Sequence, residues 1–131
     1  MSRSGYEDDP DDLAMWRGQV ASAIRGKRGQ AFLREMVEAL DAMPAKQLIT
    51  DALQVDGQYC ALGCIGAKRG FDMTNLDPKD AYKMSDVFNI ARQLVQEIEF
   101  INDECGAYDE TPEHRWRRIR DWAVEHLNEG K

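Results

Sequence analysis

Residues 60–67, with the sequence CALGCIGA, constrain the fold more than any other part of this chain. The segment carries no charge, and small side chains alternate in it with aliphatic ones. Each glycine costs about 1 kcal/mol relative to alanine in a helix interior, and tight packing against neighbouring helices accounts for that cost. Free cysteine also behaves as a small buried residue. The segment therefore predicts a short buried helix over residues 60–69.

Two helices are predicted before this segment. The first begins at Asp11 or Asp12, either of which can cap free helix amides, and the glycines of RGKRG (residues 25–29) end it by adopting positive φ. The second ends before Pro44. Apolar residues recur at helical spacing in both, and the stripe of the second comprises Phe32, Leu33, Met36, Val37, Leu40 and Met43.

Three more helices are predicted after it. Asp77-Pro78 starts one with proline in its first turn, and Asn89, which tolerates left-handed geometry, separates residues 79–88 from a helix over residues 91–103. The last helix has Thr111 as its cap, proline in its first position and Gly130 at its end. Its inward face carries Trp116, Ile119, Ala123 and Leu127, with Trp122 beside them.

The expected fold is therefore all-α, a single compact domain of five or six helices over residues 11–131. A disordered acidic tail over residues 1–10 precedes it, because that segment has little to bury. Asp56-Gly57 is a tight-turn signal that is compatible with one short β-hairpin around residues 53–59 within mostly irregular chain. A helical turn followed by a loop is the open alternative for this segment. A length of 131 residues suffices for one core.

Composition favours a cytoplasmic protein. The chain has no apolar run of the roughly 18 residues that a membrane span needs, and its first residues lack the apolar middle of a signal peptide. Three cysteines are an odd number, which argues against a disulfide framework and fits a reducing compartment. A membrane partner is not expected.

The net charge of −7 is unevenly distributed. An acidic protein repels nucleic acid at long range, so direct nucleic-acid binding is disfavoured. Residues 97–113 hold seven acids and no lysine or arginine. If those carboxylates formed a row at phosphate-like spacing, the protein would be an acidic mimic of nucleic acid, which is one alternative function.

The cysteines offer a second alternative. Cys60 and Cys64 share a helix face, but one such pair is a weak zinc signal, and no metal or other cofactor is predicted. Cys60 lies near a helix start, where a thiolate is stabilised. With Asn102, Asp103 and His114 it would form a small enzyme or ligand-binding site, provided that the four converge. Otherwise Asn102 and Asp103 organise a helix end by bonding backbone amides or an arginine.

The arginines after the acidic run supply the partner-binding hypothesis. Arginine and aromatic residues dominate interface energetics, so the predicted partner surface comprises Arg117, Arg118, Arg120 and Trp122. The competing interpretation is that these arginines pair internally with the acids that precede them. Exposed pairs of that kind contribute at most about 1 kcal/mol each.

Three motifs, YCALGCIG, FINDE and TPEHRW with IRDW, resemble a loose group of small uncharacterised bacterial proteins. The resemblance spans about residues 12–128, and IRGKRGQAFLREMVEAL is similar to phage and prophage members in particular. It implies no activity, but it directs attention to Cys60, Gly63, Asn102, Asp103 and Arg115. In that group small residues commonly stand at the position of Cys64.

Together these features predict a small soluble non-catalytic helical protein that acts by protein–protein interaction. The resemblance implies a phage or prophage accessory or host-modulating role. The partner is expected to be another protein, and the oligomeric state is left open. The enzyme or ligand-binding domain and the acidic mimic are the two alternatives.

Overall fold

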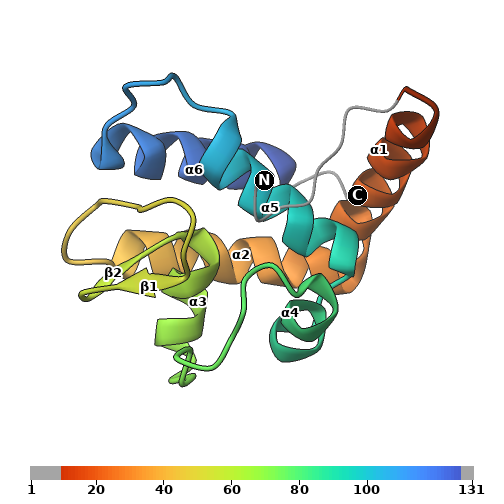
Figure 1. The fold of residues 1–131 in the computed structure, drawn as a ribbon. Coiled ribbons are helices and arrows are strands. Elements are labelled where there is room, and N and C mark those ends of the chain that lie inside the picture. Colours follow the sequence, from red (N-terminus) through yellow and green to blue (C-terminus); the bar gives the residue numbers. More distant parts are fainter. Residues whose placement is uncertain (1–9, 128–131) are drawn as a thin grey trace.

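The computed structural model describes residues 10–127, which form a mostly helical fold with one two-stranded hairpin (Figure 1). The all-α prediction and the short hairpin are therefore confirmed. Most of the predicted acidic tail falls on residues 1–9, which lie outside the described residues, as does Gly130. The elements are α1 (Pro10–Arg25), α2 (Lys27–Ala42), β1 (Gln54–Val55), β2 (Gln58–Tyr59), α3 (Ala61–Lys68), α4 (Ala81–Phe88), α5 (Arg92–Glu104) and α6 (Pro112–His126).

The corner between α1 and α2 is tighter than predicted. Gly26 alone separates the two helices, and its φ of −67° shows that the predicted positive-φ glycine cap is wrong. The glycine that matters is Gly29, inside α2. A Cβ there would lie 1.9 Å from the carbonyl oxygen of Ala23, so only glycine lets α2 pass so close to the end of α1.

The hairpin turns at Asp56 and Gly57, whose φ values of 51° and 77° are both positive. Two such residues define the type I′ turn that matches strand twist. Val55 pairs with Gln58 and Gln54 with Tyr59. The hairpin leads directly into α3, whose residues 61–66 are all buried, as the opening segment predicted.

The start of α4 differs from the prediction. Asp77-Pro78 does not begin the helix. Instead the Asp77 carboxylate accepts a hydrogen bond from the Lys79 amide in a turn, and Asp80 caps α4 by accepting one from the Lys83 amide. Asn89 ends α4 in left-handed geometry, with φ 58°, as predicted. An aspartate whose side chain reaches the free amides defines the helix start here, and proline does not.

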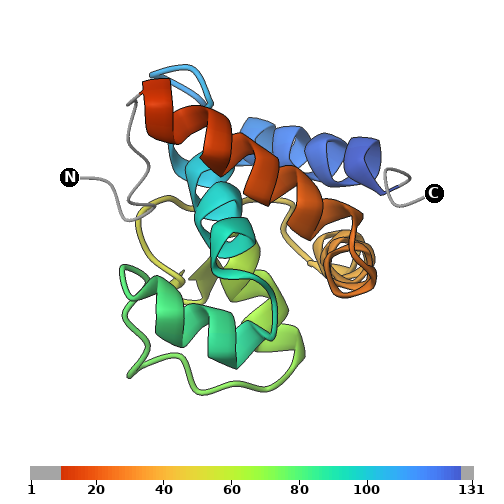
Figure 2. The same cartoon turned by 90° about the vertical axis from the view of Figure 1, so that its right-hand side faces the viewer.

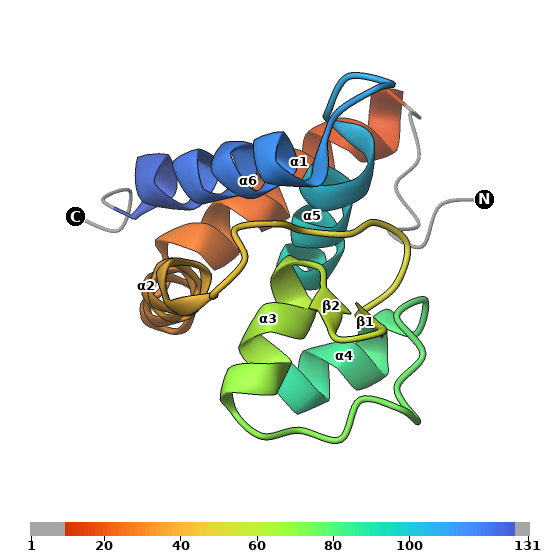
Figure 3. The ribbon, with the colours of Figure 1, turned by 90° about the vertical axis from the view of Figure 1, so that its left-hand side faces the viewer.

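The core lies where α2, α3 and α5 meet. Figures 1, 2 and 3 agree that α5 passes between α6 on one side and α3 with α4 on the other. α2 contacts both α3 and α6, while α1 and α4 pack on α5. The largest fully buried side chains are Phe88, Leu33, Met36, Leu40, Leu48, Leu62, Ile65, Met84, Ile90, Leu94, Ile98 and Ile119.

Candidate functional site

Asn102 of α5 joins three parts of the chain. Its side-chain oxygen accepts a hydrogen bond from the Ala61 amide at 3.1 Å, and its side-chain nitrogen donates to the Ile49 carbonyl at 2.9 Å and to Asp103. Asp103 in turn accepts from the Asp51 amide at 3.2 Å. Because Asn102 is only 1% exposed, these bonds hold the start of α3 and the strand-like segment before the hairpin in place.

Cys60 lies beside this cluster as the N-cap of α3. Its sulfur accepts a hydrogen bond from the Gly63 amide at 3.4 Å, and its own amide donates to the Leu53 carbonyl at 3.2 Å. The residue is 1% exposed. The structure thus brings Cys60 and Asn102, which are buried, close to the half-buried Asp103, in an arrangement whose hydrogen bonds position the backbone.

His114, the fourth member of the alternative site, lies in a different cluster. Its Nδ1 is 2.7 Å from Glu110, and its side chain is 60% exposed. Glu110 also accepts two hydrogen bonds from Arg118, at 2.7 and 2.9 Å, and pairs with Arg115 at 3.3 Å. The Glu110 side chain is 2% exposed, so a buried carboxylate gathers three basic groups.

The arginines around Glu110 also bond backbone carbonyls. Arg118 donates to the Ile101 carbonyl at 2.6 Å, and Arg115 donates to the Leu48 carbonyl at 2.7 Å. The amide of Leu48 in turn donates to the Pro112 carbonyl. This Glu110 cluster therefore ties the end of α5, the start of α6 and residues 48–49 together, which is a structural role.

The acid stability of the fold should depend on Glu110. The hydrogen bonds from Arg118, opposed by burial and reinforced by His114 and Arg115, lower the pKa of Glu110 from 4.5 to about 2. The folded state then binds this proton more weakly than the unfolded chain. The stabilisation is complete above the unfolded pKa and is lost as the pH falls from about 5 to about 2, by about 3 kcal/mol.

Urea unfolding across this pH range measures that loss, with Glu110→Gln as the control because it removes the titrating group. The difference between the two proteins in free energy of unfolding should shrink steadily toward about pH 2. If the free energies of unfolding of the two proteins fell in parallel as the pH decreased, other carboxylates would account for the acid sensitivity of the fold.

The predicted partner surface on α6 is largely engaged within the molecule. Arg118 belongs to the Glu110 cluster, and Arg120 forms a two-bond fork with Asp41 of α2 at 2.6 and 3.0 Å. Trp122 is half-buried and packs on the ring of His126. Arg117 is exposed. Pairing with the preceding acids, the competing interpretation, accounts for Arg118, whereas Arg120 pairs with an acid of a distant helix.

The acid-rich run is also partly internal. Glu97 and Glu99 are 2% and 1% exposed, and Glu97 accepts a fork of two 3.0 Å bonds from Arg17 of α1. With Glu110 neutralised by arginines, the run does not present the continuous row of carboxylates that mimicry of nucleic acid requires.

The three thiols should differ sharply in reactivity. Cys60 and Cys64 are buried, whereas Cys105 is exposed. Burial, with a smaller effect from Cys60, raises the pKa of Cys64 to about 11. Partial burial also raises the pKa of Cys105, so its advantage lies in its exposure. Since the thiolate is the reactive form, Ellman's reagent at mildly alkaline pH should modify Cys105 in the native protein and the other two only in denaturant. Mass spectrometry assigns the sites, and rapid native labelling of Cys60 would contradict the buried cap.

One cationic surface stands apart from the paired arginines. We define the cationic corner as the exposed residues Arg25, Lys27, Arg28 and Arg34 at the junction of α1 and α2. Residues 25–34 contain no acid, and among the side chains described, those of residues 14–127, no carboxylate forms an ion pair with any of the four. Arg28 donates to the Asn89 side-chain oxygen at 3.3 Å. In the sequence this segment signals a helix break, and it lacks the strand and the Gly-Lys-Ser/Thr ending of a phosphate-binding loop, so this surface was not predicted.

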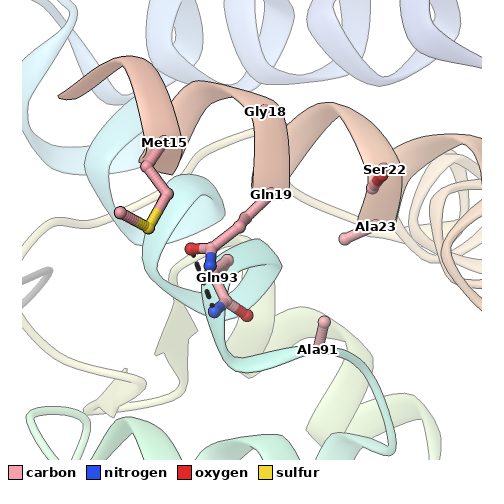
Figure 4. Close-up of a pocket in the computed structure, with 7 residues that line it drawn as sticks. All are labelled: Met15, Gly18, Gln19, Ser22, Ala23, Ala91 and Gln93. Carbon is pink, nitrogen blue, oxygen red and sulfur yellow. Dashed lines mark hydrogen bonds between the residues drawn. The ribbon is translucent and has the colours of Figure 1, made fainter. Parts of the chain in front are cut away.

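A hollow of about 570 Å³ lies between α1 and the start of α5. Figure 4 shows Gln19 of α1 facing Gln93 of α5, which donates to it at 3.3 Å. Gly18 faces open space. No titratable side chain lines this hollow, whose residues are Met15, Gly18, Gln19, Ser22, Ala23, Ala91 and Gln93. It offers van der Waals contact and amide hydrogen bonds, not acid–base chemistry.

In the described part of the chain, no three His, Cys, Asp or Glu side chains are grouped so that they could hold a metal ion. No helix between residues 10 and 127 combines the length and the apolar character that crossing a membrane requires. Comparisons with protein-family models, curated proteins and solved structures find no match to this chain.

Proposed function

We propose that this protein acts by binding another protein and not by catalysis. The observation that carries the proposal is the cationic corner, where four exposed cations lack a carboxylate partner among the described residues. Elsewhere the chain pairs its partly buried arginines, as Arg69 does with Glu35 and Arg118 with Glu110. Exposed cations that no described carboxylate pairs are available to a partner.

The polar residues of the alternative site support the same proposal. Cys60 and Asn102 bond backbone groups and are buried, and His114 lies in a separate cluster. No specific observation therefore favours an enzyme. The resemblance to phage and prophage proteins adds a proposed biological setting, in which the protein is an accessory or host-modulating factor.

Site-specific photo-cross-linking in the cells that naturally produce the protein tests this proposal. A benzoylphenylalanine placed at position 27, 82 or 117 samples three exposed faces of the described chain. The expected result is an adduct of discrete mass with one protein, which then binds the purified wild-type chain with fixed stoichiometry by calorimetry. Absence of a discrete adduct at all three positions would overturn the proposal.

A further inference from the structure

The cationic corner puts positively charged side chains at the start of a helix, where they are unfavourable. Lys27 and Arg28 occupy the first turn of α2, which contains no acidic residue, and Gly26 provides no side-chain cap. The start of a helix carries partial positive charge, so cations there are unfavourable and anions are stabilising. No acid in the first turn of α2 compensates these cations. Such local violations of helix preferences are expected at functional sites. An anionic group from outside the chain would relieve this arrangement.

The remaining cations of the corner extend the same surface. Lys27 and Arg34 lie seven residues apart and therefore share one face of α2. Arg25 is the last residue of α1. The surface is thus a strip of cations along the start of α2, rather than a single point charge. Such a strip fits several carboxylates in succession better than one small anion.

An apolar hollow adjoins the strip. It measures about 310 Å³ and lies between α2 and the α4–α5 junction, with Arg28 and Asn89 among its lining residues. Phe32, Phe88 and Ile90 also line it, and all three are almost completely buried, so they form its floor. Its lining also includes Glu35 and Arg69, whose charges pair with each other. The hollow has room for an apolar side chain of a ligand whose acidic residues lie on Lys27 and Arg28.

We propose that the cationic corner binds an acidic segment of a partner protein, with carboxylates on Lys27, Arg28 and the start of α2 and a neighbouring apolar side chain in the hollow. This inference rests on the proposed function, because it specifies the partner's chemistry. A protein segment is favoured over nucleic acid since the net charge of −7 repels a polyanion at long range. An acidic segment carries less charge and also supplies the apolar side chain.

Fluorescence anisotropy with a defined probe tests this assignment. The probe is a fluorescein-labelled peptide in which glutamates flank a central leucine and phenylalanine, and it is compared with the same peptide carrying lysines and with an oligothymidylate of equal length. Saturable binding of the acidic peptide, weakened by salt, is expected. Tighter binding of the oligothymidylate, or equal binding of both peptides, would overturn the proposal.

Two sets of variants locate the site. Arg25→Gln, Lys27→Gln and Arg28→Gln combined should weaken peptide binding about tenfold. The matched control removes three exposed cations elsewhere, through Lys79→Gln, Lys83→Gln and Arg117→Gln. Equal weakening by both sets would show a general charge effect and refute the assignment.

A single substitution separates binding from folding. Lys27→Glu places an acid in the first turn of α2, so it should raise the thermal midpoint of the free protein while it weakens peptide binding. A lowered midpoint together with intact binding would contradict the role assigned to this residue. The outcomes also distinguish this inference from the proposed function, since an adduct at position 117 with none at position 27 would retain a protein partner but reject this surface.

Discussion

Glu110→Gln is expected to lower the free energy of unfolding by about 3 kcal/mol, with a fall in melting temperature of about 10 °C. The substitution keeps the shape of the side chain but removes its charge. Arg115 and Arg118, only 14% and 21% exposed, would then lack the carboxylate that compensates them. Breaking a buried pair is costly because the remaining charge stays desolvated.

The matched control is Asp41→Asn, which removes the carboxylate partner of Arg120. Both members of that pair are substantially exposed, at 46% and 34%, and exposed pairs are worth at most about 1 kcal/mol. Chemical denaturation of both variants near neutral pH measures the difference. If Glu110→Gln cost no more than Asp41→Asn, the Glu110 cluster would not be the structural junction inferred here.

Gly63→Ala should destabilise the protein by about 3 kcal/mol or more. A Cβ at position 63 would lie 1.8 Å from the carbonyl oxygen of Leu53. That carbonyl accepts the amide of Cys60, so it cannot move without losing the bond that joins the hairpin to α3. The new methyl group has no flexible neighbour that could yield, and the backbone must shift.

Gly66→Ala is the control in the same helix. Its Cβ would meet the sulfur of Met73 at 2.5 Å, and a methionine side chain can rotate away. The gain in helix propensity, about 1 kcal/mol, offsets part of that rearrangement. Thermal unfolding should therefore show a much larger loss for Gly63→Ala. Equal losses would mean that helix burial in general, and not the Leu53 contact, determines the need for glycine.

The two glycine predictions refine the interpretation of the CALGCIGA segment. Its small residues were expected to allow close packing, and α3 is buried as predicted. The structure shows that the closest approach comes from the backbone at Leu53, which immediately precedes the hairpin, and not from another helix. The segment is thus where the hairpin docks on the helical core.

The candidate site illustrates what local sequence cannot reveal. An arginine-rich helix after an acidic run suggested both a partner surface and internal pairing. Glu110 precedes His114 by four residues, a spacing that places the two on neighbouring turns, and this was the one local signal for the cluster. That Arg120 reaches Asp41, whereas Arg25, Lys27 and Arg28 meet no carboxylate among the described residues, depends on how distant helices lie against each other.

The local structure of this protein could largely be predicted from neighbouring residues alone. Side chains and backbone preferences act over a few residues, so the caps at Thr111 and Asn89, the Asp56-Gly57 turn and the apolar stripes could be located without a structure. Two helix starts, at Pro10 and Ala81, differ from the predicted positions. In both segments several neighbouring residues are able to cap the helix, so the sequence does not single out one start.

Which polar residues are buried, and which charges stay exposed, depends on how distant segments of the chain pack against each other. Asn102 joins segments more than forty residues apart in the chain, and Arg17 meets Glu97 across 80 residues. Whether a charge is neutralised depends on distance and burial in three dimensions, and neither follows from local spacing. For this reason Arg118 and Arg120 of the expected α6 surface pair within the molecule, whereas Arg117 and the cations at the corner between α1 and α2 stay exposed.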